Sequence, residues 1–154
     1  MPLNIFIDTE FTNLLNPRLL SIALVAESGE EFYGETPYDA KECSEFVREV
    51  VLPLLDCGPN ILMSDDELFR RLNDWLRLVK PRNENIVICY DSPIDWALLS
   101  EALNGQLPTW CVPRLVDDLI SEPLRYNYFN QSGQPEHHAL NDARANCYAF
   151  RERT

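Results

Sequence analysis

The hydrophobic residues at the start of the chain fall into three short runs rather than into helical spacing. Residues 3–7 are rich in β-branched and aromatic side chains and end at Asp8, which predicts a buried strand. Residues 18–27 predict a second strand, and residues 31–35 predict a third. A Ser-Gly turn signal at residues 28–29 separates these two strands, so we expect them to form an antiparallel hairpin.

Helical spacing begins after residue 38. Asp39, followed three positions later by an acidic residue, predicts a capped helix start. Ser64 and Glu67 have the same spacing and predict a second helix that extends to Val79. The expected apolar face of the first helix consists of Cys43, Phe46, Val47, Val50 and Val51. The expected apolar face of the second consists of Leu68, Leu72, Trp75, Leu76 and Val79.

The second half of the chain combines further strands and helices. Residues 85–90 are apolar on both faces, as in a central parallel strand, and a Ser-Pro pair then predicts a helix over residues 92–103. Residues 108–135 are the least regular, and we expect a short strand or turn over residues 114–117 followed by a loop. A last helix is predicted over residues 138–153.

This order of elements predicts one α/β domain over residues 1–154, with a mixed sheet flanked by helices. A length of 154 residues is typical of a single domain. The 13 basic and 25 acidic residues give a net charge of −12, which by itself argues against a nucleic-acid partner because phosphate binding depends mainly on Lys and Arg. Carboxylates that hold divalent cations would reverse the field locally.

No pattern in the sequence predicts contact with a membrane. No apolar run approaches the roughly 18 residues of a membrane-spanning helix, and no basic leader precedes an apolar stretch at the start. The odd number of cysteines and the absence of a C-x-x-C pair favour reduced interior thiols over disulfides or a zinc site. We therefore expect a soluble, cytoplasmic protein. The five cysteines are Cys43, Cys57, Cys89, Cys111 and Cys147.

The candidate chemistry is acidic. Asp8 and Glu10 lie two residues apart at the end of the first strand, so their side chains point to the same face. Two like charges there are costly unless a cation lies between them, although a D-x-E pair also occurs in solvated turns. Asp95 lies just past the carboxyl end of the fourth strand, where open α/β sheets place their sites. A role at the helix start would also explain Asp95, and Asp91 is an alternative in the same loop.

Both histidines of the chain precede Asp142 near the start of the last helix. His137, five residues earlier, would not share a face with Asp142 in a continuous helix. If the helix begins after His137, that imidazole lies on the entry loop while Asp142 is held in the first turns. His138, four residues before Asp142, would share its face and allow a structural hydrogen bond. Taken singly, the histidine pair is explained by a capped helix start.

In combination, these groups resemble the DEDDh branch of the 3′–5′ exonucleases, which have the RNase H-like fold. The matching residues are Asp8, Glu10, Asp95, His137 and Asp142. The small size and the Asp-Thr-Glu-Phe-Thr opening are most similar to compact exoribonucleases of mycobacterial type. The chain departs from the family pattern at Asn141, where the last motif more often has an acidic residue. It also departs in the approach to the middle motif, which keeps Asp91 open as the middle carboxylate.

The resemblance implies a two-metal mechanism with a histidine base. Asp8, Glu10, Asp95 and Asp142 would hold two Mg²⁺ or Mn²⁺ ions, since hard cations prefer oxygen ligands. His137 would be the general base that takes the proton from the attacking water, because imidazole changes its charge close to neutral pH.

The resemblance also implies contacts with the substrate. Thr9, Phe11 and Thr12 would offer backbone N–H groups and a stacking face to the terminal nucleotide, although Phe11 could equally be a core residue. Three arginines are further candidates for phosphate contacts, although a solvated surface position is the simpler expectation for each: Arg114, Arg125 and Arg144.

The expected activity is metal-dependent release of nucleotides from the 3′ end of single-stranded RNA or short oligonucleotides. A chain of net charge −12 has little basic surface for a long duplex. The alternatives are an exodeoxyribonuclease, an RNase H-like endonuclease without the histidine, and a catalytically silent nucleic-acid or protein-binding module. Relatives with this fold often pair, so a homodimer is also expected.

Overall fold

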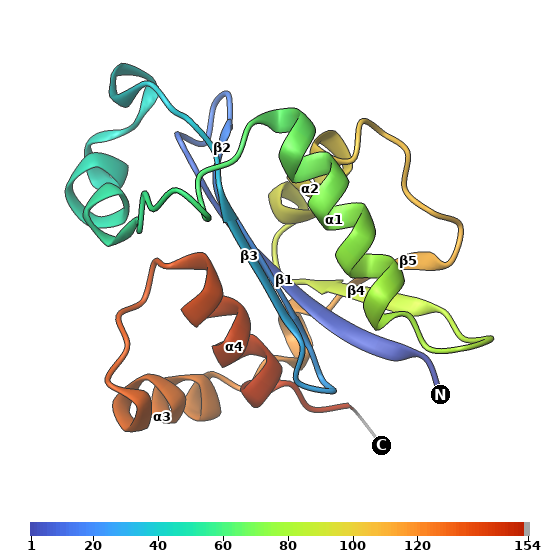
Figure 1. The fold of residues 1–154 in the computed structure, drawn as a ribbon. Helices are drawn as coiled ribbons and strands as arrows, with labels where there is room; N and C mark the ends of the chain where they lie inside the picture. Colours follow the sequence, from blue (N-terminus) through green and yellow to red (C-terminus); the bar gives the residue numbers. More distant parts are fainter. Residues whose placement is uncertain (153–154) are drawn as a thin grey trace.

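The computed structural model describes residues 1–152, and its centre is a five-stranded mixed sheet (Figure 1). The strands are β1 (Leu3–Phe11), β2 (Leu19–Ala26), β3 (Glu31–Glu35), β4 (Ile86–Tyr90) and β5 (Cys111–Leu115). They lie in the order β3-β2-β1-β4-β5. The first three strands pair antiparallel, whereas β4 runs parallel to both β1 and β5. The predicted mixed α/β sheet is confirmed.

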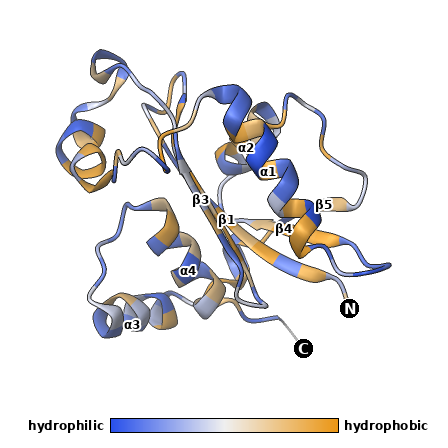
Figure 2. Ribbon diagram, viewed as in Figure 1, coloured by the Kyte–Doolittle hydropathy of each residue, from blue (hydrophilic) through white to orange (hydrophobic). Residues whose placement is uncertain are grey.

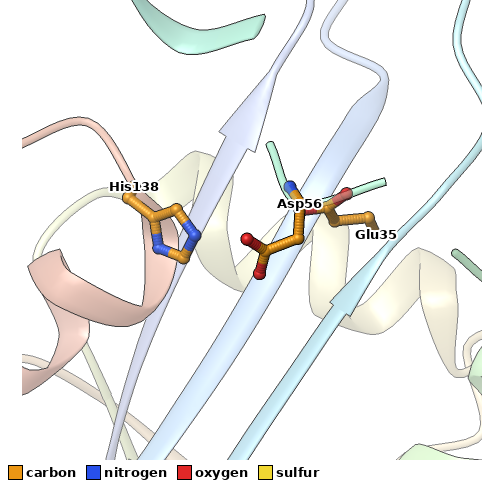
Figure 3. A group of neighbouring side chains, drawn as sticks. All are labelled: Glu35, Asp56 and His138. Atoms are coloured by element: carbon orange, nitrogen blue, oxygen red, sulfur yellow. The ribbon is translucent and has the colours of Figure 1, made fainter. Parts of the chain in front are cut away.

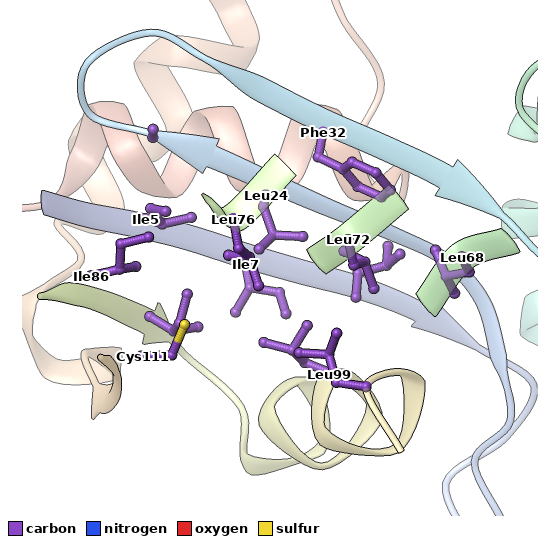
Figure 4. Packing of buried hydrophobic residues seen from close by; sticks show 14 of the residues in the cluster. Ile5, Ile7, Leu24, Phe32, Leu68, Leu72, Leu76, Ile86, Leu99 and Cys111 are labelled. Carbon is purple, nitrogen blue, oxygen red and sulfur yellow. The ribbon is translucent and has the colours of Figure 1, made fainter. Parts of the chain in front are cut away.

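Helices α1 (Asp65–Val79) and α2 (Pro93–Ala102) supply the core on one face of the sheet. Figure 4 shows Leu68, Leu72 and Leu76 of α1 packed against residues of the strands. The predicted cap of α1 is present, since the Ser64 Oγ accepts the N–H of Glu67 at 3.2 Å. Figure 2 shows hydrophobic residues concentrated on β1 and β4, while α1 carries long hydrophilic stretches. The spacing of apolar residues in α1 thus agrees with its packing.

Helix α4 (Ala139–Ala149) packs on β1 and β2 on the other face, and α3 (Glu122–Ser132) packs against α4 (Figure 1). The side chains of Ala139 and Ala143 are completely buried beside Ala23 and Val25 of β2. Such small side chains let a helix approach a sheet closely. Because Asp142 lies between these two alanines in sequence, it is carried close to β1.

The single helix predicted after Asp39 is wrong. Residues 40–54 instead contain a 3₁₀ turn η1 (Ala40–Glu42), a π-helical turn η2 (Val47–Val51) and a 3₁₀ turn η3 (Leu52–Leu54). The Asp39 carboxylate does cap the first turn by accepting the N–H of Lys41 at 3.0 Å. Cys43 is extended and interrupts the helical path, and Phe46 of the expected apolar face is 51% exposed.

The loop predicted before Pro135 is also wrong, because residues 122–132 form α3. Its N-cap is Ser121, whose Oγ accepts the N–H of Leu124 at 3.4 Å, and its C-cap is Gly133 at φ +68°. None of the residues of α3 is fully buried, and only Leu124, Tyr128 and Phe129 of its apolar side chains are half-buried, so the apolar periodicity of this segment is weak. Ser121 and Gly133, which cap the two ends, are the sequence features that indicate this helix.

Three further boundaries and positions differ from the predictions. Strand β1 extends past Asp8 to Phe11, so both candidate carboxylates of that segment lie within the strand. The last helix ends at Ala149, and the predicted end at residue 153 lies outside the described residues. All five cysteines are free, but Cys57 is exposed rather than interior.

Over residues 1–152, no helix combines the length and the apolar character needed to cross a membrane.

Candidate metal centre

Strand β1 places the first two carboxylates. Its parallel pairing with β4 ends at Phe6 and Cys89, so Asp8 and Glu10 lie beside the segment that leaves β4. On its other side β1 remains paired with β2 through both positions. The alternation of side chains along the strand puts Asp8 and Glu10 on one face.

Asp95 is fixed against β1 by Thr9. Ser92 caps α2, since its Oγ accepts the N–H of Ile94 at 3.4 Å, and Asp95 lies in the first turn. The Oδ1 atom of Asp95 accepts both the backbone N–H of Thr9 at 3.2 Å and its hydroxyl at 2.6 Å. Asp95 is 2% exposed. The residue between the two carboxylates of β1 therefore orients a third carboxylate.

Asp142 lies in the first turn of α4, and His137 lies on the loop before that helix. The backbone N–H of His137 donates to both carboxylate oxygens of Asp142, at 3.2 Å each. His137 has φ +66°, and its ring packs against that of Phe46 in a T-shaped arrangement at a centroid distance of 5.1 Å. This is the arrangement expected if the helix begins after His137, with the imidazole projecting from the loop.

These carboxylates converge on two neighbouring positions. Oxygen atoms of Asp8, Glu10 and Asp142 lie within 4.8 Å of one another, and so do oxygen atoms of Asp8, Asp91 and Asp95. Each group is large enough to surround one cation, and Asp8 belongs to both. The structure thus brings all four predicted carboxylates together and adds Asp91 to them.

Burial makes this group of carboxylates hard to ionise. It raises the pKa of Asp8 well above its usual value, and the neighbouring carboxylates Asp95, Asp142 and Glu10 raise it further. Burial is also the main reason that the pKa of Glu10 and that of Asp95 are each raised to about 8. The pKa of Asp142 is raised to about 6 by burial, against which Arg125 and His137 act. Without a cation, the ionised group is destabilised near neutral pH.

One atom in the group has the environment of a metal ligand. The Oδ2 atom of Asp8 is buried and accepts no hydrogen bond from any of residues 1–152. A buried carboxylate oxygen without a donor is costly unless a cation is close to it. All the candidate ligand atoms in the two groups that share Asp8 are carboxylate oxygens, which suit hard divalent cations such as Mg²⁺ and Mn²⁺. The residues present therefore fit such ions.

The second histidine, His138, belongs to a different group (Figure 3). Its ring stacks on Tyr33 at a centroid distance of 4.8 Å and lies near Glu35 and Asp56. The Glu35 carboxylate accepts the hydroxyl of Tyr33 and the backbone N–H groups of Asp56 and Cys57, at 2.7 and 2.8 Å for the last two. These bonds tie residues 56–57 to β3, so a structural role accounts for Glu35. Among the described residues, no side-chain hydrogen bond joins His138 to Asp142.

The predicted substrate contacts next to Asp8 are largely occupied within the protein. The N–H of Thr9 donates to Asp95, and that of Thr12 donates to the carbonyl of Arg18 at 3.0 Å. Thr12 is 1% exposed, whereas Phe11 is only partly buried. Of the three predicted substrate contacts, Phe11 is the residue with surface to offer.

Two further side chains, Asn146 and Arg125, lie beside the carboxylates. Arg125 was a candidate from the sequence, whereas Asn146 was not. Asn146 is 3% exposed and lies one helical turn after Asp142. Its Nδ2 donates to the Oδ2 of Asp91 at 3.2 Å, and its Oδ1 accepts the Nε–H of Arg125 at 3.1 Å. The spacing of four residues from Asp142 places both side chains on one face of α4, which was the available signal.

No family model matches the sequence, and no curated protein matches it. Solved structures do match. Cell-death related nuclease 4 (CRN-4) superposes with a TM-score of 0.61 at 12% identity, covering 94% of this chain and 61% of that one. The nuclease domain of 3′hExo, a DEDDh family member bound to rAMP, superposes with a TM-score of 0.59 at 13% identity. The match covers 94% of this chain and 88% of that one.

The fold is RNase H-like. A third structure, of a 3′-exonuclease that recognises the 3′ end of the histone mRNA stem-loop, gives a TM-score of 0.50 at 10% identity and covers 94% of this chain and 76% of that one. The chain spans about three fifths of the length of CRN-4. The structural neighbours are therefore nucleases, and this chain shares their fold at low sequence identity.

Proposed function

We propose that the chain is a metal-dependent 3′–5′ exonuclease that acts on single-stranded RNA or short oligonucleotides. The observation that carries the proposal is the position of Asp8, which belongs to two groups of three carboxylates and has a buried oxygen without a donor. The neighbours with this fold are described as nucleases and as a 3′-exonuclease, which supports the direction of attack. The resemblance of the five motif residues supports the DEDDh type.

Two Mg²⁺ or Mn²⁺ ions, when bound, would neutralise charge at the attacking and leaving oxygens of the phosphodiester and lower the pKa of the attacking water. Asp8, Glu10 and Asp142 would hold one ion, and Asp8 and Asp95 the other. Asp95 is our choice for the middle carboxylate because it is buried and held twice by Thr9. Asp91 lies in the same group and would be an additional oxygen ligand there.

His137 would take the proton from the attacking water at a nitrogen of its ring. Its position supports this role, because the backbone of His137 is bonded to Asp142 while its ring projects from the loop and is 43% exposed. His138 is a poor alternative because its ring is stacked on Tyr33, beside Glu35 and Asp56. Phe11 would offer a face on which the terminal base stacks.

The finer parts of the proposal rest on the sequence. The Asp-Thr-Glu-Phe-Thr opening supports the compact mycobacterial-type exoribonucleases as the nearest branch. We propose one exonuclease domain over residues 1–154, located in the cytoplasm, where the five free cysteines would remain reduced. We also propose a homodimer, which light scattering on the purified protein would test.

The test is release of nucleotides from a 5′-labelled RNA oligomer, with a matched DNA oligomer alongside. With Mg²⁺ or Mn²⁺ we expect mononucleotides and a ladder that shortens from the 3′ end, and no cleavage in EDTA. Asp8→Asn should abolish release, and His137→Ala should slow it near neutral pH. The matched control His138→Ala should retain the rate if it folds.

Other outcomes would contradict the proposal. Retarded migration of the oligomer without shortening would indicate a binding module, and internal cleavage would indicate an endonuclease. Full activity in Asp8→Asn would remove the metal assignment, and a slow His138→Ala with a normal His137→Ala would transfer the base role to His138. Faster digestion of the DNA oligomer would change the substrate class.

A further inference from the structure

Arg125 approaches carboxylates less closely than Arg114 and Arg144 do. Arg114 and Arg144 form close pairs with Glu152 and Glu31, at 2.6 Å each. Arg125 approaches Glu136 and Asp142 at 3.7 and 3.8 Å, distances too long for hydrogen bonds. Its charge lies beside the carboxylate group without being committed to one carboxylate.

The guanidinium of Arg125 is held by two contacts that leave its outer N–H groups available. Its Nε–H donates to Asn146 at 3.1 Å, and its Cζ lies 5.1 Å from the ring centroid of Phe129. Over residues 1–152, neither Nη atom donates a hydrogen bond, and the side chain is 23% exposed. A guanidinium fixed at one edge and open at the other presents the paired donors that suit a phosphate.

We propose that Arg125 binds a phosphate of the nucleotide at the carboxylate group, donating from its two Nη atoms. The proposal deepens the proposed exonuclease function and rests on it. The Nη2 atom lies 3.8 Å from Asp142, which belongs to the metal-binding group, so a phosphate held there would be within reach of the guanidinium. The chemical class of ligand is a nucleoside 5′-monophosphate or the phosphodiester at a 3′ end.

Asn146 is the residue that positions the guanidinium of Arg125. It accepts from Arg125 and donates to Asp91, so one buried amide joins the phosphate-binding arginine to the carboxylate group. Arg125 comes from α3 and Asn146 from α4, and these two helices pack together. The phosphate site is therefore formed by two helices and depends on their packing.

The experiment measures binding of AMP and of adenosine by calorimetry in the presence of Mn²⁺. The two ligands differ only in the phosphate, so their comparison isolates the proposed contact. The wild type, Arg125→Gln, Arg125→Lys and the surface control Arg114→Gln are compared, with the melting temperature of each as a check on folding. Nucleotide release by the wild type is measured separately on the labelled RNA oligomer.

We expect Arg125→Gln to weaken AMP binding by about 10- to 100-fold and to leave adenosine binding unchanged. Arg125→Lys should weaken AMP binding less, because an ammonium lacks the fork that serves Asn146 and the phosphate together. Arg114→Gln should bind both ligands like the wild type.

Wild-type affinity for AMP in both Arg125 variants would overturn the proposal, even if the wild type degrades RNA. An equal loss for adenosine and AMP would overturn it as well, because the effect would not depend on the phosphate. A wild type that binds AMP more tightly than adenosine through Arg125 but releases no nucleotides would contradict the exonuclease function while retaining the phosphate site.

Discussion

Thr9 is the residue that holds Asp95, our proposed middle carboxylate, in place. It donates two hydrogen bonds to one oxygen of Asp95 from a position between Asp8 and Glu10 on β1. Mutation of a residue that orients a metal ligand typically lowers metal affinity or activity by about 10- to 100-fold. The side chain of Thr9 thus supports the proposed metal centre without belonging to it.

Replacing Thr9 by Val should weaken the metal centre without unfolding the chain. The substitution keeps the shape and removes the hydroxyl that bonds to Asp95 at 2.6 Å. We expect the Mn²⁺ concentration for half-maximal nucleotide release to rise by about tenfold. The control is Thr36→Val, which removes a buried hydroxyl bonded to the carbonyl of Leu19 at 2.7 Å. An equal change in both variants would contradict this role for Thr9.

Glu10 should make the metal-free protein less stable as the pH rises. Its pKa is raised from 4.5 to about 8, chiefly by burial, so the folded state holds a proton that the unfolded chain has lost. The contribution of Glu10 to the free energy of unfolding is therefore lost between about pH 4.5 and pH 8.

Thermal unfolding of Glu10→Gln in EDTA tests this directly. At pH 5 the melting temperatures of variant and wild type should be similar, and at pH 8 the variant should be higher by about 2–4 °C for each kcal/mol relieved. Saturating Mn²⁺ should raise the melting temperature of the wild type more than that of the variant. Glu45→Gln, at an exposed position, should show neither effect. A variant that melts below the wild type at pH 8 would contradict the electrostatic explanation.

At the scale of elements, α3 depends on its ends rather than on burial. Ser121 caps the start, Gly133 closes the end in the left-handed region, and no residue of the helix is buried. The helix nevertheless supplies Arg125 to the site. A helix held in this way should be sensitive to changes at its caps.

Gly133→Ala should loosen α3 through the backbone alone. A new Cβ there would meet nothing within 4 Å, but φ is +68°, which costs an L-residue about 1 kcal/mol. We expect faster hydrogen exchange in α3, with unchanged exchange in β1. Gly58→Ala is the matched control, because its Cβ would also meet nothing and its φ is outside the left-handed region. Equal effects of the two substitutions would show that φ is not the cause.

Across the whole molecule, the negative charge limits how the proposed nucleic-acid substrate can be held. The net charge is −12, and several arginines are paired with surface carboxylates, among them Arg18, Arg71, Arg114 and Arg144. With 25 acidic against 13 basic residues, the chain disfavours an extended track of contacts along a phosphate backbone. Binding should therefore concentrate on the terminal nucleotide, through the carboxylate group, Phe11 and Arg125.

The salt dependence of RNA degradation tests whether binding is confined to the terminal nucleotide. With about one or two phosphates contacted by basic residues, kcat/KM should fall less than about tenfold between 50 and 200 mM salt. Oligomers of a few nucleotides should be degraded about as efficiently as longer ones. A fall of about a thousandfold, or a strong preference for long strands, would indicate an extended basic groove elsewhere on the surface.

Several elements could be predicted because their signals are local. The stripe of α1 and its Ser64 cap lie within one segment, and so do the apolar runs of the strands. The segment after Asp39 does not form the predicted single helix, because extended Cys43 interrupts an apolar spacing that is otherwise helical. Helix α3 gives only a weak periodic signal, since it packs on α4 without fully burying a residue.

By itself, the sequence determined the mixed α/β sheet and the order of the motif that resembles the DEDDh nucleases, because alternation, caps and motif spacing are properties of neighbouring residues. Only the tertiary structure decided that Asp91 joins Asp8 and Asp95, that His138 turns to Tyr33, and that Arg125 reaches Asp142. These groups come from segments far apart in the chain. Their distances depend on how closely α4 packs on β1 and how α3 packs on α4, and no local pattern encodes that packing.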